Sequence, residues 1–428
     1  MLKQTRSIAK TSASRLLRLQ APKDLTTDDV RDARLYIALF WKKLQRNHPK
    51  DSGSGLGLPK PYIVPAQEEG REFDFNELYY WDSYFIAQGL LDTEHEALVS
   101  GILEDLLSLF KRFSVIPNAS RTYLTGRSQP PLLTSFIFDL YNVYQPGLPW
   151  LKEHMALAEQ EYHTVWMGTT KPHARQVHQG LSRYYDVNMT HDLAEAESGW
   201  DYTPRFGRQC LNYLPVDLNS LLYKYELDFA RAAKLLGDSA AAERWSDAAE
   251  ARKHTMNKLM WDRVRKIYVD YNYVKEKRGS VMSLATFFPM WAGMVDEKQA
   301  KLLVKALRRF EQKGGLATTD SMPLGKYVPG SMPVQWAYPN GWSPLHFVVV
   351  KALQRYGYHD DARRIAMKWL RTNLGWFTEH GVFLEKYNVV NPEKPPAKGV
   401  YPSQTGFGWT NAIFERFCQE FIDGTPQN

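Results

Sequence analysis

The chain is poor in cysteine and has no long hydrophobic run. Only two cysteines, Cys210 and Cys418, occur in 428 residues, so a disulfide framework is excluded. Such scarcity is typical of a reducing compartment, and we expect a cytoplasmic protein. Because no apolar stretch approaches the ~18 residues that cross a bilayer, we also expect no membrane-spanning helix.

The sequence also lacks the common motifs for metal, nucleotide and serine-nucleophile chemistry. Its 11 histidines show no His-Glu-x-x-His spacing, and His173 and His178 share a polar loop without an acidic companion, so we expect no metal site. No Gly-x-Ser-x-Gly elbow, Walker motif or Rossmann glycine pattern is present. We therefore expect a protein that works without a cofactor.

A concentrated patch of basic charge is missing as well. The net charge is +7, but lysines and arginines are dispersed among acidic residues and form no stripe for nucleic acid. Residues 1–20 are basic and serine-rich without an apolar core, which argues against a secretory signal. We expect a flexible leader over residues 1–25, with a transit peptide as the alternative.

Helical periodicity dominates what is present. Residues 217–236 and 239–261 predict an antiparallel pair across Gly237-Asp238, and similar pairs recur along the chain. Only residues 266–272 alternate like a strand. About a dozen helices, mostly in hairpins, favour one closed all-α toroid over residues 26–424, with an open helical solenoid as the alternative. Long polar segments between the helices predict a functional face built from loops.

One carboxylate lies in an unusual setting. Asp201 stands between Trp200 and Tyr202, close to Arg205. Apolar rings disfavour the charged form of a carboxyl group, which is what a general acid requires near neutral pH. Aromatic faces beside polar groups also suit a sugar, and 13% of the residues are aromatic, although a large helical core would explain them equally well. A buried structural aspartate at a helix end is the alternative interpretation.

Six sequence blocks, in this order, resemble those of one known family. They are residues 75–85, 116–131, 197–206, 335–344, 385–389 and 406–411. Together they are similar to the signatures of the trehalase family, glycoside hydrolase family 37. The resemblance spans roughly residues 60 to 415.

The resemblance implies an (α/α)6 toroid whose active site is built from loops on one face, and hydrolysis of the small carbohydrate trehalose with inversion. Asp201 would be the general acid and Glu385 the base that activates water. A surface glutamate beside Lys386 is the alternative for Glu385. Arg205 is expected to brace the Asp201 loop. The substrate-binding residues implied are Phe75, Trp81, Asp82, Asn118, Arg127, Gln129, Gly199, Gln335, Trp336 and Trp409.

The chain also departs from the family pattern around the second sugar. Asp74 stands where the family has an arginine, Ala337 replaces an aspartate, and Val400 replaces a glutamate. A site that loses hydrogen-bonding partners loses discrimination, so the leaving group could differ. Two alternatives therefore stay open: a hydrolase of another small α-glycoside, such as glucosylglycerate or mannosylglycerate, and a sugar-binding toroid without turnover.

Overall fold

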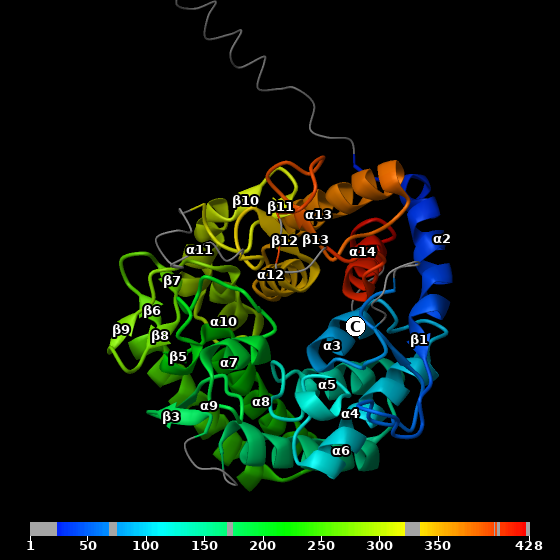
Figure 1. The fold of residues 1–428 in the computed structure, drawn as a ribbon. Helices are drawn as coiled ribbons and strands as arrows, with labels where there is room; N and C mark the ends of the chain where they lie inside the picture. Colours follow the sequence, from blue (N-terminus) through cyan, green and yellow to red (C-terminus); the bar gives the residue numbers. More distant parts are fainter. Residues whose placement is uncertain are drawn as a thin grey trace, which may run out of the picture.

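The helices of the computed structural model form two concentric rings (Figure 1). The structure describes residues 24–67, 75–168, 174–321, 334–397, 399 and 403–424. The outer helices are α2 (Thr27–Leu44), α4 (Glu96–Phe113), α6 (Leu148–Glu161), α9 (Ser239–Leu259), α11 (Glu297–Ala306) and α13 (His359–His380). The inner helices are α3 (Tyr80–Gln88), α5 (Leu133–Tyr144), α8 (Val216–Leu235), α10 (Phe288–Trp291), α12 (Ser343–Arg355) and α14 (Gly408–Phe421). Along the chain, outer and inner helices alternate, which confirms the expected toroid.

The residue pattern of each ring explains its position. All nine residues of the inner helix α3 are buried, whereas the outer helix α9 buries little more than one stripe. A helix that is apolar on every side requires neighbours all round, while an amphipathic helix covers a core with one face. Asp238 caps α9 by accepting a hydrogen bond from the amide of Ala241.

The ring closes where the last helix, α14, packs against the first inner helix, α3. Gly89, at the C-terminal end of α3, makes this approach possible. A Cβ atom at Gly89 would lie only 2.4 Å from the Cα atom of Ala412 in α14. This closing contact excludes an open solenoid.

Strands are short and pair in small antiparallel sheets. The two-stranded sheets are β1 (Gln45–Arg46) with β2 (Tyr62–Ile63), β3 (Gln176–His178) with β4 (Leu181–Ser182), β6 (Trp261–Asp262) with β7 (Ile267–Tyr268), β10 (Glu311–Gln312) with β11 (Gly315–Leu316), and β12 (Asn340–Trp342) with β13 (Lys386–Asn388). The three-stranded sheet has the order β5 (Tyr213–Leu214), β8 (Tyr271–Asn272), β9 (Lys277–Arg278). In the β12–β13 pair, Trp342 lies opposite Lys386, which brings two of the predicted blocks together.

Two expectations about local structure are wrong. The single strand expected over residues 266–272 is split between β7 and β8, because Asp270 turns inward between them to accept hydrogen bonds from Arg205 and Val216. Helical periodicity over residues 282–294 predicts one continuous helix, but this segment starts with a 3₁₀ turn (Leu284–Phe287), and α10 is only one turn long. Pro289 lacks the amide hydrogen that a continuous helix needs.

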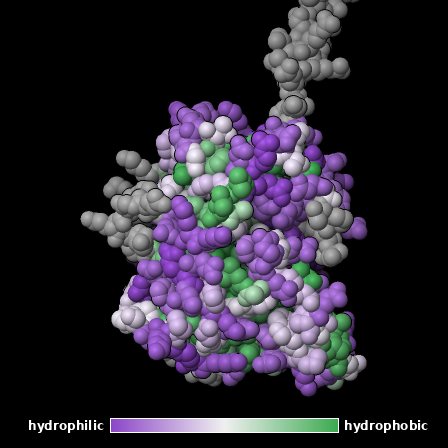
Figure 2. Space-filling view, turned by 90° about the vertical axis from the view of Figure 1, so that its right-hand side faces the viewer, coloured by the Kyte–Doolittle hydropathy of each residue, from purple (hydrophilic) through white to green (hydrophobic). Residues whose placement is uncertain are grey.

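The surface is mostly polar on the side that carries α2. Figure 2 shows this side as largely hydrophilic, broken by a narrow row of hydrophobic residues. Within the described ranges, no helix is both long enough and apolar enough to cross a bilayer. Most of the leader expected over residues 1–25 lies outside the described residues.

The ring-closing contact gives a stability prediction. Gly89→Ala should destabilise the protein by roughly 1–3 kcal/mol, because the new methyl group meets the backbone of α14. Gly375→Ala is the matched control: this exposed glycine inside α13 has no neighbour within 4 Å of an added Cβ. It should gain about 0.5–1 kcal/mol from lower backbone entropy in the unfolded chain. Urea unfolding of both variants measures the difference, and equal stability would contradict the role of Gly89.

Candidate active site

A cavity of about 710 Å³ opens at the end of the ring where the inner helices begin. The first turns of α3 and α14 contribute to its wall, and segments that lead from outer to inner helices supply the rest. Eleven of the twelve predicted site residues line it. They are Phe75, Trp81, Asp82, Asn118, Arg127, Gln129, Gly199, Asp201, Trp336, Glu385 and Trp409.

The twelfth predicted residue, Gln335, acts on the cavity through Asp201. Its side-chain amide donates a 3.0 Å hydrogen bond to Oδ2 of Asp201. Asp201 is half-buried, and burial, followed by the charge of Glu385, raises the pKa of Asp201 to about 6. The structure therefore gives Asp201 the environment that a general acid requires.

The tight turn before Asp201 depends on Gly199. Its φ of +71° is in the left-handed region, and a Cβ atom there would lie 2.7 Å from the Trp81 ring. Gly199 thus lines the cavity by leaving room for Trp81.

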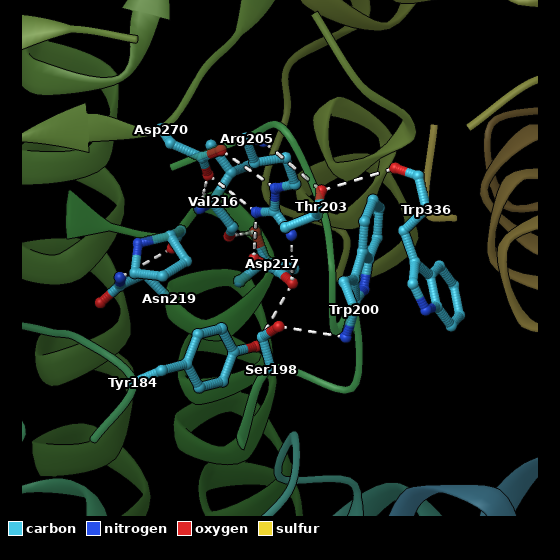
Figure 3. A network of polar contacts seen from close by, with 12 residues as sticks. Tyr184, Ser198, Trp200, Thr203, Arg205, Val216, Asp217, Asn219, Asp270 and Trp336 are labelled. Carbon is cyan, nitrogen blue, oxygen red and sulfur yellow. Dashed lines mark hydrogen bonds and ion pairs between the residues drawn. The ribbon is translucent and has the colours of Figure 1, made fainter. Parts of the chain in front are cut away.

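Behind the Asp201 loop, Arg205 is fully buried between two aspartates (Figure 3). Its guanidinium lies 2.6 Å from Asp217 and 2.8 Å from Asp270, and it stacks over the ring of Trp200 at 4.4 Å. Arg205 is absent from the cavity wall. The geometry agrees with the expected bracing role, because planar two-sided pairing fixes the backbone next to Asp201.

Glu385 is not a surface residue. It is 2% exposed, and Lys386 beside it is fully buried. The Lys386 ammonium lies 2.6 Å from Oε2 of Glu385 and 4.9 Å from the centre of the Trp342 ring. Glu385 therefore has a buried cationic partner at the cavity wall.

A third carboxyl group lies in the same cavity. Asp82, in the first turn of α3, is 5% exposed. Burial is the main cause that raises the pKa of Asp82 to about 8, and the charges of Glu385 and Asp201 add to it. At neutral pH Asp82 is therefore mainly protonated and can donate as well as accept a hydrogen bond.

Three further predicted residues, Gln129, Asn118 and Arg127, already bond to other groups of the protein. The Gln129 carbonyl accepts from the amide of Trp81 at 2.9 Å, Asn118 donates to a backbone oxygen at 3.1 Å, and Arg127 lies 3.1 Å from Asp186. Such bonds fix the orientation of these groups before a ligand arrives.

Three tryptophans make an aromatic wall. The ring of Trp81 lies 5.8 Å from that of Trp336 and 6.1 Å from that of Trp409. Trp342, which is not part of the wall, stacks flat on Trp336 at 3.8 Å. Together with the carboxyl groups, this wall gives the cavity apolar faces and hydrogen-bonding edges, the two features that a sugar ring presents.

Comparison with known proteins decides the family. The family model for trehalase matches residues 6–196 and 182–421. The chain belongs to the trehalase family. It is 31% identical to a cytosolic neutral trehalase of Emericella nidulans, over 91% of this chain and 62% of that protein. It is 33% identical to a periplasmic trehalase of Xanthomonas oryzae pv. oryzae, over 90% of this chain and 73% of that protein.

Solved structures support the same assignment. The neutral trehalase Nth1 of Saccharomyces cerevisiae is 29% identical, with a TM-score of 0.72 over 85% of this chain and 74% of that one. A mannosylglycerate hydrolase of Thermus thermophilus shares the fold at 17% identity and a TM-score of 0.65, covering 90% and 99% of the two chains. The chain spans only about three fifths of the length of the fungal relatives such as that of Emericella nidulans.

Two glutamates near Asp201 in this trehalase-family chain were not predicted as functional from the sequence, and only the first of them lines the cavity. Glu195 lines the cavity and accepts a 3.0 Å hydrogen bond from the amide of Thr203, and burial is the main cause that raises the pKa of Glu195 to about 8. Glu197 is fully buried and accepts from the backbone amides of Ser128 and Tyr185 and from Arg175. Their closeness to Asp201 along the sequence could have indicated a role in the site. No sequence pattern, however, distinguishes a buried glutamate from a solvated one.

The departures from the family pattern have different outcomes. Ala337 is fully buried and is absent from the cavity wall, so its side chain does not face a ligand there. Asp74 and Val400 lie outside the described residues, as does His173. In the described part of the chain, no three His, Cys, Asp or Glu side chains are grouped to hold a metal ion.

The buried arginine gives a second stability prediction. Arg205→Met should cost about 3–5 kcal/mol of folding free energy, because it leaves Asp217 and Asp270 buried without their cation. The control is Lys313→Met, which breaks the exposed pair with Glu393 and should cost less than about 1 kcal/mol. Denaturant unfolding compares them, and similar losses would show that Arg205 is not a brace.

Proposed function

We propose that this protein is an α-glycosidase that hydrolyses trehalose with inversion. The observation that carries the proposal is the meeting of Asp201 and Glu385 in one cavity, with burial and the charge of Glu385 raising the pKa of Asp201 to about 6. The two carboxyl groups come from distant blocks of the chain, and their environments differ: the pKa of Asp201 is raised to about 6, mainly by burial, whereas Glu385 is paired with Lys386. This difference supports Asp201 as the acid and Glu385 as the base.

In the proposed reaction, Asp201 donates its proton to the glycosidic oxygen as the bond to the anomeric carbon breaks. Glu385 takes a proton from a water molecule, and the oxygen of that water attacks the anomeric carbon from the opposite face. Inversion requires the two carboxyl groups to be about 6.5–9.5 Å apart, which leaves room for the water. One water is consumed, and two glucose molecules leave.

The first sugar would occupy the pocket lined by the predicted substrate-binding residues. Asp82, Asn118, Arg127 and Gln129 provide donors and acceptors for hydroxyl groups, and Trp81 belongs to the aromatic wall. Gln335 would position Asp201 rather than contact sugar. We further propose that residues 26–424 act as one catalytic domain.

We infer a reducing compartment, such as the cytoplasm, for this activity. Cys210 and Cys418 are both unpaired and buried, so neither contributes a disulfide. The relatives include cytosolic and periplasmic trehalases.

Substitution of the two carboxyl groups tests the proposed roles. Asp201→Asn and Glu385→Gln should each lower kcat on trehalose by about 10²–10⁴-fold, because each removes one proton transfer. Glu379→Gln, at an exposed position, should leave kcat unchanged. Unfolding temperatures check that each variant folds, and near-normal turnover by either would contradict the assigned role.

The same assay on other substrates separates the alternatives. The panel contains trehalose, other α-linked diglucosides, glucosylglycerate and mannosylglycerate. Release of glucose from trehalose supports the proposal. Release from another member, with trehalose inert, would assign a different leaving group, and protection against heat by trehalose without turnover would indicate a binding protein.

The pH profile tests the electrostatics. The acid must be protonated, so kcat/KM on trehalose should fall as the pH rises through about 6, where Asp201 loses its proton. The charge of Lys386 lowers the pKa of Asp201, so Lys386→Met should move this limb to higher pH and should also reduce kcat by leaving Glu385 without its cation. Lys301→Met, on the exposed face of α11, should leave the profile in place. If the fall of kcat/KM occurs at the same pH in Lys386→Met as in the unchanged protein, the proposed effect of Lys386 on the pKa of Asp201 is wrong.

A further inference from the structure

A second cavity, of about 500 Å³, is lined by the inner ring and shares no residue with the candidate active site. All six inner helices contribute to its wall, and on α3 and α14, the two that line both cavities, its residues lie further along the helix than those of the first cavity. An aromatic layer separates the two cavities. Trp81, in the first, contacts Phe85 at 5.3 Å, and Phe85 contacts Phe347, in the second, at 6.0 Å.

The wall of this second cavity is strongly basic. It holds five cationic side chains, Lys224, Arg231, Lys351, Arg355 and Arg416. Its one carboxyl group, Asp139, accepts a 2.9 Å hydrogen bond from Gln88, and burial is the main cause that raises the pKa of Asp139 above its usual range. The acid therefore offsets little of the surrounding positive charge.

Three of the five cations have carboxylate partners outside the cavity wall. Lys224 lies 2.5 Å from Asp228, while Lys351 and Arg416 lie 2.5 and 2.8 Å from Glu420. Five cations thus meet two such carboxylates and the weakly acidic Asp139, which leaves an excess of positive charge.

The excess charge is carried by two arginines. In the described part of the chain, neither Arg231 nor Arg355 forms an ion pair with a carboxylate. Arg231 is oriented all the same: it donates to Asn142 at 2.9 Å and lies 4.1 Å over the Phe138 ring. An oriented guanidinium with unused donors matches the oxygens of a phosphate group.

Helix dipoles do not account for the whole set of cations. The C-terminal ends of the inner helices carry partial negative charge, which basic side chains commonly offset, but this effect is confined to the last turn. Lys224 lies in the middle of α8, well before its end at Leu235, and still faces the cavity.

We propose that this second cavity binds a phosphate monoester of a small polyol or sugar. Arg231 and Arg355 take the phosphate, with Lys224, Lys351 and Arg416 supplying the positive field. The amide and hydroxyl groups of the wall, from Gln354, Asn142 and Ser135, bond the hydroxyl groups of the ligand. The site is independent of the proposed hydrolysis, since it shares no residue with the first cavity.

Equilibrium titration with glycerol 3-phosphate tests the proposal, with glycerol as the uncharged probe and the ionic strength held constant with sodium chloride. Saturable binding of the phosphate ester, and none of glycerol, is expected. The paired variant Arg231→Gln with Arg355→Gln should weaken binding by about tenfold or more.

A charge-matched control pairs Arg244→Gln with Arg263→Gln, at two exposed positions outside the cavity. This pair should bind like the unchanged protein, and unfolding temperatures without ligand check that both pairs fold. Three results would overturn the proposal: no saturable binding, equal weakening in both pairs, or full binding in the cavity pair. The first means no site, the second an effect of net charge alone, and the third a site elsewhere, including the candidate active site.

Discussion

The buried pairing of Arg205 with Asp217 and Asp270 fixes the part of the chain on which the candidate chemistry depends. Three ionised groups inside a helical core are stable only if they satisfy one another, so the backbone that carries them has little freedom. Asp201 lies four residues before this arginine, so the fixed position of Arg205 also restricts the backbone at Asp201. The same pairing explains why Asp270 breaks the expected strand, since Asp270 has to face inward.

The carboxyl groups of the first cavity differ in their pKa values and in their partners. Asp82, Asp201 and Glu385 share one partly dehydrated space, in which like charges disfavour one another. Lys386 neutralises one of them. Burial is the main cause that raises the pKa values of the other two, Asp82 and Asp201, and in the proposed reaction Asp201 is the acid and Glu385 the base.

The inner ring uses its two ends differently. Where the helices begin, carboxyl groups and tryptophans gather, and further along the same helices lysines and arginines gather. Side chains near the N-terminal ends are held by loops of varied sequence, whereas those at the other end project directly from the helices. A single scaffold therefore presents two cavities, one lined by several carboxyl groups and one by several cations, separated by aromatic packing.

The sequence by itself determined that the fold consists mainly of helices in hairpins, and its resemblance to the trehalase family indicated eleven of the residues that line the first cavity. Helical periodicity reports local backbone geometry, and the blocks around Asp201 and Glu385 are contiguous along the chain. Only the tertiary structure decided that Lys386 is buried against Glu385, that Glu195 and Glu197 face inward, and that a basic cavity exists. These features depend on which side chains lose their contact with water when distant segments pack, and no local pattern contains that information.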